Sequence, residues 1–136
     1  MALRYAPAQG TVVTVNFDEG FKPPEMVKRR LAVILSLPIK ARGGLVTVVP
    51  LSTTAPKPPM PWHCEIDLPF ELPSYWGSRP RWVKGDMINA VGFHRVDLLS
   101  LGKASDGRRI YQTGTIPRDM LTRIQVCVLR SLGLRS

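Results

Sequence analysis

KRRLAVILS, residues 28–36, joins three consecutive cations to a five-residue apolar run that closes with a serine. A short apolar run rich in branched side chains is typical of a strand that is buried on both faces. We therefore expect a core strand whose cations lie where the strand meets solvent. An arginine held at the mouth of a rigid strand is a permanently charged fork that suits a phosphate group. The alternative, a loop of solvated cations before a core strand, explains the stretch better when it is taken alone.

Length and composition predict one domain, residues 1–136, because 136 residues with 44% hydrophobic side chains can bury a core. Nineteen lysines and arginines outnumber ten acids, which gives a formal net charge of +9. This balance indicates a polyanionic partner, such as nucleic acid, an anionic membrane surface or an acidic protein. It does not indicate sequence specificity, because attraction to phosphate does not read bases.

The chain has few cysteine and histidine residues that could bind a metal ion. Cys64 and Cys127 share no metal-like spacing, and His63 and His94 are the only histidines. A structural zinc site needs about four ligands, so we predict neither metal nor cofactor. The simplest reading of the cysteines is reduced thiols. The chain also has no signal-like apolar run and no apolar stretch near roughly 18 residues, which predicts a cytoplasmic protein without a membrane span.

Turn residues and β-branched stretches predict six or seven short strands. The main candidates are residues 11–17, 31–36, 45–49, 63–68, 81–84 and 87–93. Pro50 is expected to end the third of these strands. Residues 98–101 and 109–112 are expected to pair across the Asp106-Gly107 turn. Residues 55–82 form a proline-rich, elaborated loop region, whose first part is expected to be extended.

One amphipathic helix is predicted over residues 115–132. Apolar residues from 121 to 128 repeat at helical spacing, Thr115 is expected to cap the helix, and Pro117 suits its first turn. The predicted fold class is therefore mainly β with a C-terminal helix. A small twisted barrel or a strongly bent sheet, with the helix over an open end, fits this order of elements.

The chain lacks a glycine-rich phosphate loop and a serine-elbow motif, so its candidate chemistry rests on polar residues at strand ends. These are Glu25, Lys28 and Arg30 before the second strand, Ser52, Thr53 and Thr54 after the third, and Lys84 with Asp86 at a strand break. Each has a plainer interpretation: Asp86 suits a turn that bonds nearby amides, and residues 52–54 suit a hydroxyl-rich turn.

Aromatic residues alternate with cations between residues 62 and 84. They are Trp62, Tyr75, Trp76 and Trp82, beside Arg79, Arg81 and Lys84. This combination suits the stacking of unpaired bases along a phosphate path. Core packing is the alternative for each aromatic residue, and for Trp82, inside a strand, it is the favoured one.

Five segments, in order, resemble the MazF/PemK (Kid) toxins of bacterial type II toxin–antitoxin modules, and most closely the PemK-like branch. They are residues 10–18 (GTVVTVNFD), 30–36 (RLAVILS), 50–52 (PLS), 83–86 (VKGD) and 114–117 (GTIP) with the helix that follows. The resemblance spans nearly the whole chain and implies a small SH3-like barrel with a C-terminal helix. Leu31, Ser52 and Lys84 replace the usual proline, threonine and arginine, and the proline-rich segment is longer than in compact members.

The resemblance also implies a metal-independent endoribonuclease that cuts single-stranded RNA at short motifs and leaves 2′,3′-cyclic phosphate and 5′-hydroxyl ends. It implies a homodimer that a cognate antitoxin inhibits. By position, Arg30 matches the catalytic arginine and Ser52 the catalytic threonine, while Asp86 and Lys84 match the proposed base and acid. The residues expected to bind RNA are Glu25, Lys28, Arg29, Thr53, Thr54, Lys57, Trp76, Arg79 and Arg81.

A binding protein without chemistry is the alternative function. Related toxins of the same fold poison DNA gyrase by binding it, and a basic barrel can also simply hold RNA. A gyrase poison has no need of Arg30, Ser52 and Asp86 as a cluster, and its effect would rest on C-terminal residues 132–136.

Overall fold

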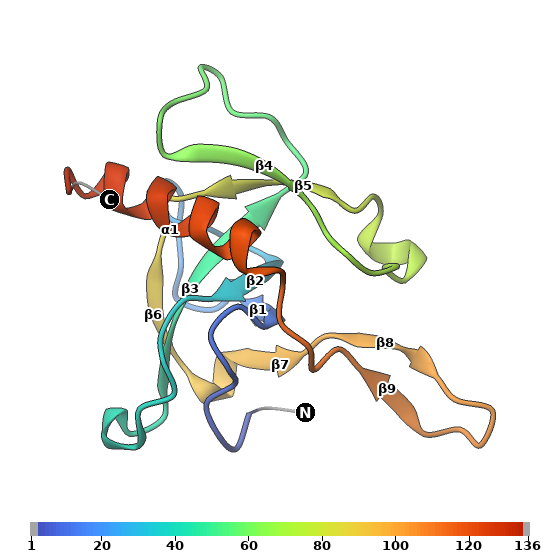
Figure 1. The fold of residues 1–136 in the computed structure, drawn as a ribbon. Helices are drawn as coiled ribbons and strands as arrows, with labels where there is room; N and C mark the ends of the chain where they lie inside the picture. The colour runs from blue at the N-terminus through green and yellow to red at the C-terminus, as the bar shows by residue number, and fades with distance from the viewer. Residues whose placement is uncertain (1–2, 135–136) are drawn as a thin grey trace.

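The computed structural model describes residues 3–134, which form a seven-stranded antiparallel sheet, a two-stranded hairpin and one C-terminal helix (Figure 1). The strands are β1 Val12–Asn16, β2 Arg29–Ile34, β3 Leu45–Ser52, β4 His63–Asp67, β5 Pro80–Lys84, β6 Asn89–Gly92, β7 Val96–Leu98, β8 Ser100–Lys103 and β9 Arg109–Tyr111. The helix is α1 Arg118–Ser131, and short 3-10 turns lie at η1 Lys40–Arg42, η2 Ser74–Trp76 and η3 Phe93–Arg95. The predicted class, mainly β with a C-terminal helix, is confirmed.

Strand β3 organises the bent sheet because it pairs with three neighbours. The order is β4-β5-β3-β2-β1-β7, and β6 pairs with β3 on the side that β5 also occupies. The first half of β3 pairs with β6, whereas its last two residues, Leu51 and Ser52, pair with β5. Within residues 3–134 the pairing path runs from β4 to β7 without joining these two ends.

Strand β2 is buried on both faces, as its apolar run predicts. Its four residues from Leu31 to Ile34 are 0% exposed. Leu31 and Val33 pack in one cluster with Ile124 of α1, while Ala32 and Ile34 pack in a second cluster on the other face. Figure 1 shows α1 lying across one face of the sheet, where it covers the first cluster. The preceding cations lie at the solvent end of this rigid strand.

Strand β3 continues two residues past Pro50, so the prediction that Pro50 ends it is wrong. Leu35 N–H donates to the Thr47 carbonyl at 2.8 Å, and Thr47 N–H donates to Ser36 Oγ at 3.0 Å. Backbone groups alternate in direction along a strand, so Pro50 directs its nitrogen away from β2. It faces the gap between β6 and β5, where a missing N–H breaks no ladder bond.

The predicted cap of α1 is also wrong, although the helix itself is confirmed. The helix begins at Arg118, and Pro117 stands at its N-cap without a side-chain hydrogen bond. Thr115 instead forms a β-bridge with Thr11, while Ile116 N–H donates to the Gly10 carbonyl at 3.0 Å. This bridge holds Thr115 in the sheet, so it cannot reach the first turn of the helix.

The remaining elements follow the predictions with shifted bounds. The pairing of residues 98–101 with 109–112 is confirmed as the β8–β9 hairpin, which starts at Ser100 and contains a register shift. The proline-rich region includes β4, and the strand expected over 87–93 is shorter because η3 follows Gly92. In the part of the chain from residue 3 to 134, no helix is long and apolar enough to cross a bilayer.

Candidate active site

Arg30 and Ser52 lie at adjacent ends of the neighbouring strands β2 and β3. The β2–β3 pairing runs from Ile34–Val48 to Ala32–Pro50, and extending the same register by two residues places Arg30 across from Ser52. Ser52 in turn pairs with Trp82 of β5. Directly opposed residues share a face, with Cβ atoms about 4.5–5.5 Å apart. Arg30, Ser52 and Trp82 therefore form one row across three strands, which we call the Arg30 row.

The guanidinium of Arg30 is positioned by the loop that precedes its strand. It is half-buried, and its Nε donates to the Val27 carbonyl at 3.0 Å. Lys28, with a φ of 73°, adopts the left-handed conformation, and its carbonyl accepts the Phe17 N–H at 2.9 Å. Among residues 3–134 no carboxylate pairs with Arg30. Its terminal nitrogens are thus oriented and open to an anion.

Ser52 is only 8% exposed, and its hydroxyl oxygen accepts the Thr54 N–H at 3.1 Å. This is the hydroxyl-rich turn that the sequence offers as the plainer interpretation. The bond uses a lone pair of the oxygen and leaves the hydroxyl hydrogen able to donate. A turn role and a role toward substrate are therefore compatible at this residue.

Arg81 lies close behind the Arg30 row and is 4% exposed. Its Nε donates to the Ser78 carbonyl at 3.1 Å, and a terminal nitrogen donates to the Trp76 carbonyl. Burial, and secondarily the positive charge of Arg30, lowers the pKa of Arg81. No carboxylate within the described residues pairs with either arginine. Two guanidinium groups without a counter-charge among these residues create a positive field at the start of β2.

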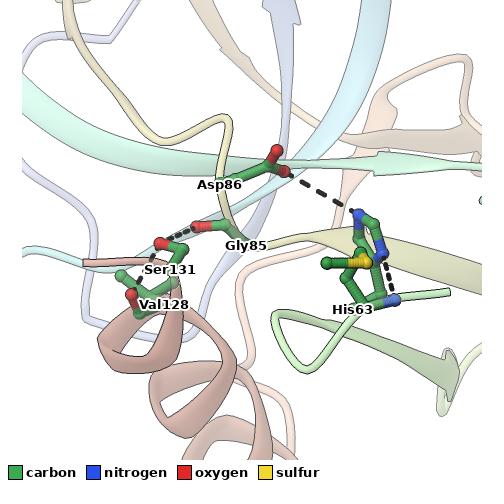
Figure 2. Close-up of polar contacts among 6 residues, drawn as sticks. His63, Gly85, Asp86, Val128 and Ser131 are labelled. Carbon is green, nitrogen blue, oxygen red and sulfur yellow. Dashed lines mark hydrogen bonds and ion pairs between the residues drawn. The ribbon is translucent and has the colours of Figure 1, made fainter. Parts of the chain in front are cut away.

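A second group of candidate residues lies further along the same face. The β4–β5 register pairs His63 with Lys84, which is two residues from Trp82 and shares its face. Asp86 follows in the turn after β5, is 47% exposed, and its Oδ1 lies 3.8 Å from His63 Nε2 (Figure 2). We call His63, Lys84 and Asp86 the His63 group.

His63 is the functional candidate that the sequence reasoning missed. Its side chain is 10% exposed, and its Nδ1 accepts the Met60 N–H at 3.1 Å. In the neutral ring the proton therefore sits on Nε2, facing Asp86. Burial lowers the pKa of His63 from its usual 6.5, the Asp86 charge opposes this, and the Lys84 charge adds to it. Its place beside Lys84 depends on the strand register, which the sequence pattern alone does not provide.

The turn that carries Asp86 is fixed from behind by the end of α1. Gly85 N–H donates to the Trp62 carbonyl at 3.1 Å, and the Ser131 hydroxyl donates to the Gly85 carbonyl at 3.0 Å. The same hydroxyl lies 2.7 Å from the Val128 carbonyl (Figure 2). Asp86 is thus held by backbone contacts on one side and faces His63 on the other.

The structure joins the predicted catalytic residues in two sets rather than one. Arg30 and Ser52 share a row, whereas the side chain that faces the Asp86 carboxylate is His63 rather than Arg30. Two strand spacings, about 10 Å, separate β2 from β5. Lys84 also lies two residues along β5 from Trp82, so the two sets are offset along the sheet as well as across it.

The residues expected to bind RNA are mostly exposed but differ in their partners. Arg29 lies 3.9 Å from Asp97, Arg79 lies 3.6 Å from Asp67, and Glu25 accepts the Lys22 N–H at 3.2 Å. Lys28, Thr53, Thr54 and Lys57 are also exposed. Trp76 is half-buried, and its indole nitrogen has no hydrogen-bond partner. Buried Arg81 acts through its charge and its loop contacts.

This fold is shared with solved toxin structures. MazF from Deinococcus radiodurans aligns with a TM-score of 0.63 and 23% identity, over 96% of this chain and 99% of that one. An endoribonuclease from a mycobacterial species, solved with its cognate antitoxin, aligns with a TM-score of 0.58 and 20% identity, over 96% and 99%. At these identities the likeness establishes the fold.

Sequence comparison establishes the family. Residues 8–132 match the model of the PemK-like, MazF-like toxins of type II toxin–antitoxin systems, and the chain belongs to this family. An uncharacterised Haemophilus influenzae protein is 29% identical over 126 residues, which cover 87% of this chain and 78% of that protein. The resemblance carried by the five sequence segments is thereby confirmed.

Proposed function

We propose that this protein is a toxin endoribonuclease that cleaves single-stranded RNA without a metal ion. The observation that carries the proposal is the guanidinium of Arg30, which the Val27 carbonyl orients and which pairs with no carboxylate of residues 3–134, on the strand beside the one that carries Ser52. An oriented cation without a counter-ion, at a solvent-facing strand end, is suited to a phosphate. Membership of the toxin family supports the same reaction.

RNA supplies its own nucleophile, so the reaction requires a base, an acid and stabilisation of charge. The base removes the 2′-hydroxyl proton, the oxygen attacks the adjacent phosphorus, and the acid protonates the departing 5′-oxygen. The products are a 2′,3′-cyclic phosphate and a 5′-hydroxyl. In this proposal Arg30 donates to the charge that develops on the phosphorane oxygens, and Ser52 donates to one of them.

Asp86 is the proposed base and Lys84 the proposed acid, because arginine gives up a proton very reluctantly. His63 is a positioning residue: it faces the Asp86 carboxylate at 3.8 Å. The scissile phosphate would lie between the Arg30 row and the His63 group. Sequence specificity at short motifs is proposed with this activity.

The proposed partners are single-stranded RNA, a second copy of the chain and a cognate antitoxin. The mycobacterial endoribonuclease of the same fold was solved with its cognate antitoxin, which supports the last of these. The net charge of +9 suits both RNA and an acidic protein segment. We place this activity in the cytoplasm.

The test is incubation of the purified protein with a long single-stranded RNA in excess EDTA. Arg30→Ala is compared with Arg108→Ala, which removes an arginine that is 84% exposed on the β8–β9 hairpin. Fragments with 2′,3′-cyclic phosphate ends are expected from the wild type and Arg108→Ala but not from Arg30→Ala. Intact RNA with a salt-dependent gel shift would instead make this a binding protein.

A further inference from the structure

A small pocket outside the two residue sets lies between η2 and the β8–β9 hairpin. It has a volume of about 150 Å³ and reaches β1, the first residue of β2, and β7. Its aromatic lining is Tyr75 and Trp76 from η2 and Tyr111 from β9, and its cationic lining is Arg29 and Arg109. Figure 1 shows η2 and the hairpin projecting on the same side of the molecule.

The size and lining of this pocket suit one planar ring. Drug-sized sites have volumes of roughly 300–1,000 Å³, so a cavity of 150 Å³ holds a single ring system rather than a whole nucleotide. The Tyr75 and Trp76 rings are 5.5 Å apart and tilted by 44°, so they do not stack flat on each other. Tyr75 is also 73% exposed. An open aromatic face of this kind is a stacking platform for a base.

The charges around the pocket favour a base over a free phosphate. Arg29 is 55% exposed and Asp97 is 28% exposed, with 3.9 Å between Arg29 Nη1 and Asp97 Oδ2. A carboxylate at the pocket wall repels an anion that would fill the cavity, but it accepts hydrogen bonds from the N–H groups of a base. Arg29 and Arg109 remain beside the pocket for the flanking phosphates.

Two links connect this pocket to the Arg30 row. Arg29 and Arg30 are consecutive residues of β2, so they point to opposite faces at its exposed start. The Trp76 carbonyl also accepts the guanidinium of Arg81, which lies close to Arg30. A strand of RNA that crosses the start of β2 can therefore meet both places within a short length.

We propose that this pocket binds one unpaired base of the RNA strand, next to the phosphate that Arg30 holds. The inference rests on the proposed function, because it names a base subsite for the same substrate. Tyr75 and Tyr111 supply the stacking surface, and the pocket contributes to the choice of cleavage motif. Loss of one base–aromatic stack is expected to weaken binding by about tenfold.

The test measures binding of the full chain to DNA oligomers, which lack the 2′-hydroxyl and are not cleaved. Oligo(dA), oligo(dC) and oligo(dT) are compared with an abasic oligomer of the same length and charge. The variants are Tyr75→Ala, Tyr75→Phe, which keeps the ring, and Tyr5→Ala, which removes a tyrosine that is 68% exposed at another pocket. Sedimentation of each variant shows whether its oligomeric state has changed.

Tyr75→Ala is expected to lose about tenfold in affinity for at least one base-bearing oligomer and nothing for the abasic one. Tyr75→Phe and Tyr5→Ala are expected to bind as the wild type does. Equal losses with the abasic oligomer, unchanged affinity throughout, or a loss explained by an altered oligomeric state would each overturn the subsite. Failure of RNA cleavage would leave this result intact, because the oligomers report binding alone.

Discussion

The imidazole of His63 and the carboxylate of Asp86 face one another, with 3.8 Å between Nε2 and Oδ1. The other ring nitrogen accepts the Met60 N–H at 3.1 Å, so the ring is oriented by the backbone before it meets Asp86 (Figure 2). In a protonated ring Nδ1 would also carry a hydrogen, so it could no longer accept the Met60 N–H and two donors would face each other. The arrangement therefore favours a neutral ring with its proton on the nitrogen nearest Asp86.

The first prediction concerns the titration of His63. Burial lowers the pKa of His63 below 6.5, and this outweighs the attraction of Asp86. The unfolded chain then binds more protons than the folded chain below about pH 6.5, so the free energy of unfolding falls as the pH decreases through that region. Above it, His63 contributes no pH dependence. His63→Gln is expected to flatten this part of the profile.

The measurements are the NMR titration of the His63 ring and urea unfolding of both proteins across this pH range. A His63 midpoint above 6.5 would show that the Asp86 charge dominates over burial, and the stability profile would then have the opposite sign.

The second prediction tests Asp86 as the base. Asp86→Asn keeps the size of the side chain but removes the proton acceptor, and is expected to slow RNA cleavage by about 10²-fold or more. RNA binding is expected to persist, since a negative charge is lost. The control is Asp67→Asn, which alters an acid that is 63% exposed at the end of β4 and paired with Arg79. If Asp86→Asn cleaves RNA at the wild-type rate, Asp86 is not the base and its contact with His63 is structural.

The third prediction concerns close packing at Gly85. A Cβ atom there would lie 2.5 Å from the Trp62 carbonyl oxygen and 3.1 Å from the Cys127 carbonyl carbon. Because both of these obstacles are backbone atoms, Gly85→Ala is expected to lower the free energy of unfolding by about 1–3 kcal/mol. Gly114→Ala is the control, since its nearest neighbour is the flexible end of Gln112. Equal urea midpoints for the two variants would show that close packing at Gly85 does not cause the loss of stability.

The strands and the helix could be predicted from the sequence far better than the contacts between them. The apolar run in β2 and the helical repeat in α1 each carry a period that a single segment displays. The predictions for Pro50 and Thr115 are wrong because the roles of both residues depend on neighbouring strands. The approach of His63 to Asp86 likewise depends on the β4–β5 register, which no local pattern encodes.

Arg81 is a second example of a residue whose surroundings could not be predicted from the sequence. A cation between aromatic residues predicts an exposed binding surface, yet Arg81 is only 4% exposed. Its burial is possible because the carbonyls of Trp76 and Ser78, in a loop without regular pattern, accept its N–H groups. Loop carbonyls leave no signature in composition or periodicity, so a buried arginine of this kind is recognised only in three dimensions.

The fourth prediction concerns the reactivity of Cys64. Burial, followed by a hydrogen bond with the Cys127 thiol, raises the pKa of Cys64 to about 12. At about pH 8 the thiolate fraction is then far below that of an ordinary thiol. Alkylation of the native protein is expected to be at least about tenfold slower than in denaturant, because the thiolate is the nucleophile and the greater nucleophilicity of a high-pKa thiolate offsets only part of its lower population. Cys127→Ala is expected to speed it. Equal rates in both states would contradict the raised pKa.

The last prediction separates the charge of Arg81 from its contacts. Arg81→Lys and Arg81→Met both lose the fork that binds the Trp76 and Ser78 carbonyls, but only Arg81→Lys keeps the charge. If the charge beside Arg30 helps to attract RNA, Arg81→Met binds severalfold more weakly at about 50 mM salt, and Arg81→Lys stays near wild type. The difference is expected to shrink as salt rises. Circular dichroism and thermal unfolding confirm that both variants fold. Equal weakening of the two would assign Arg81 to the loop contacts rather than to the field around Arg30.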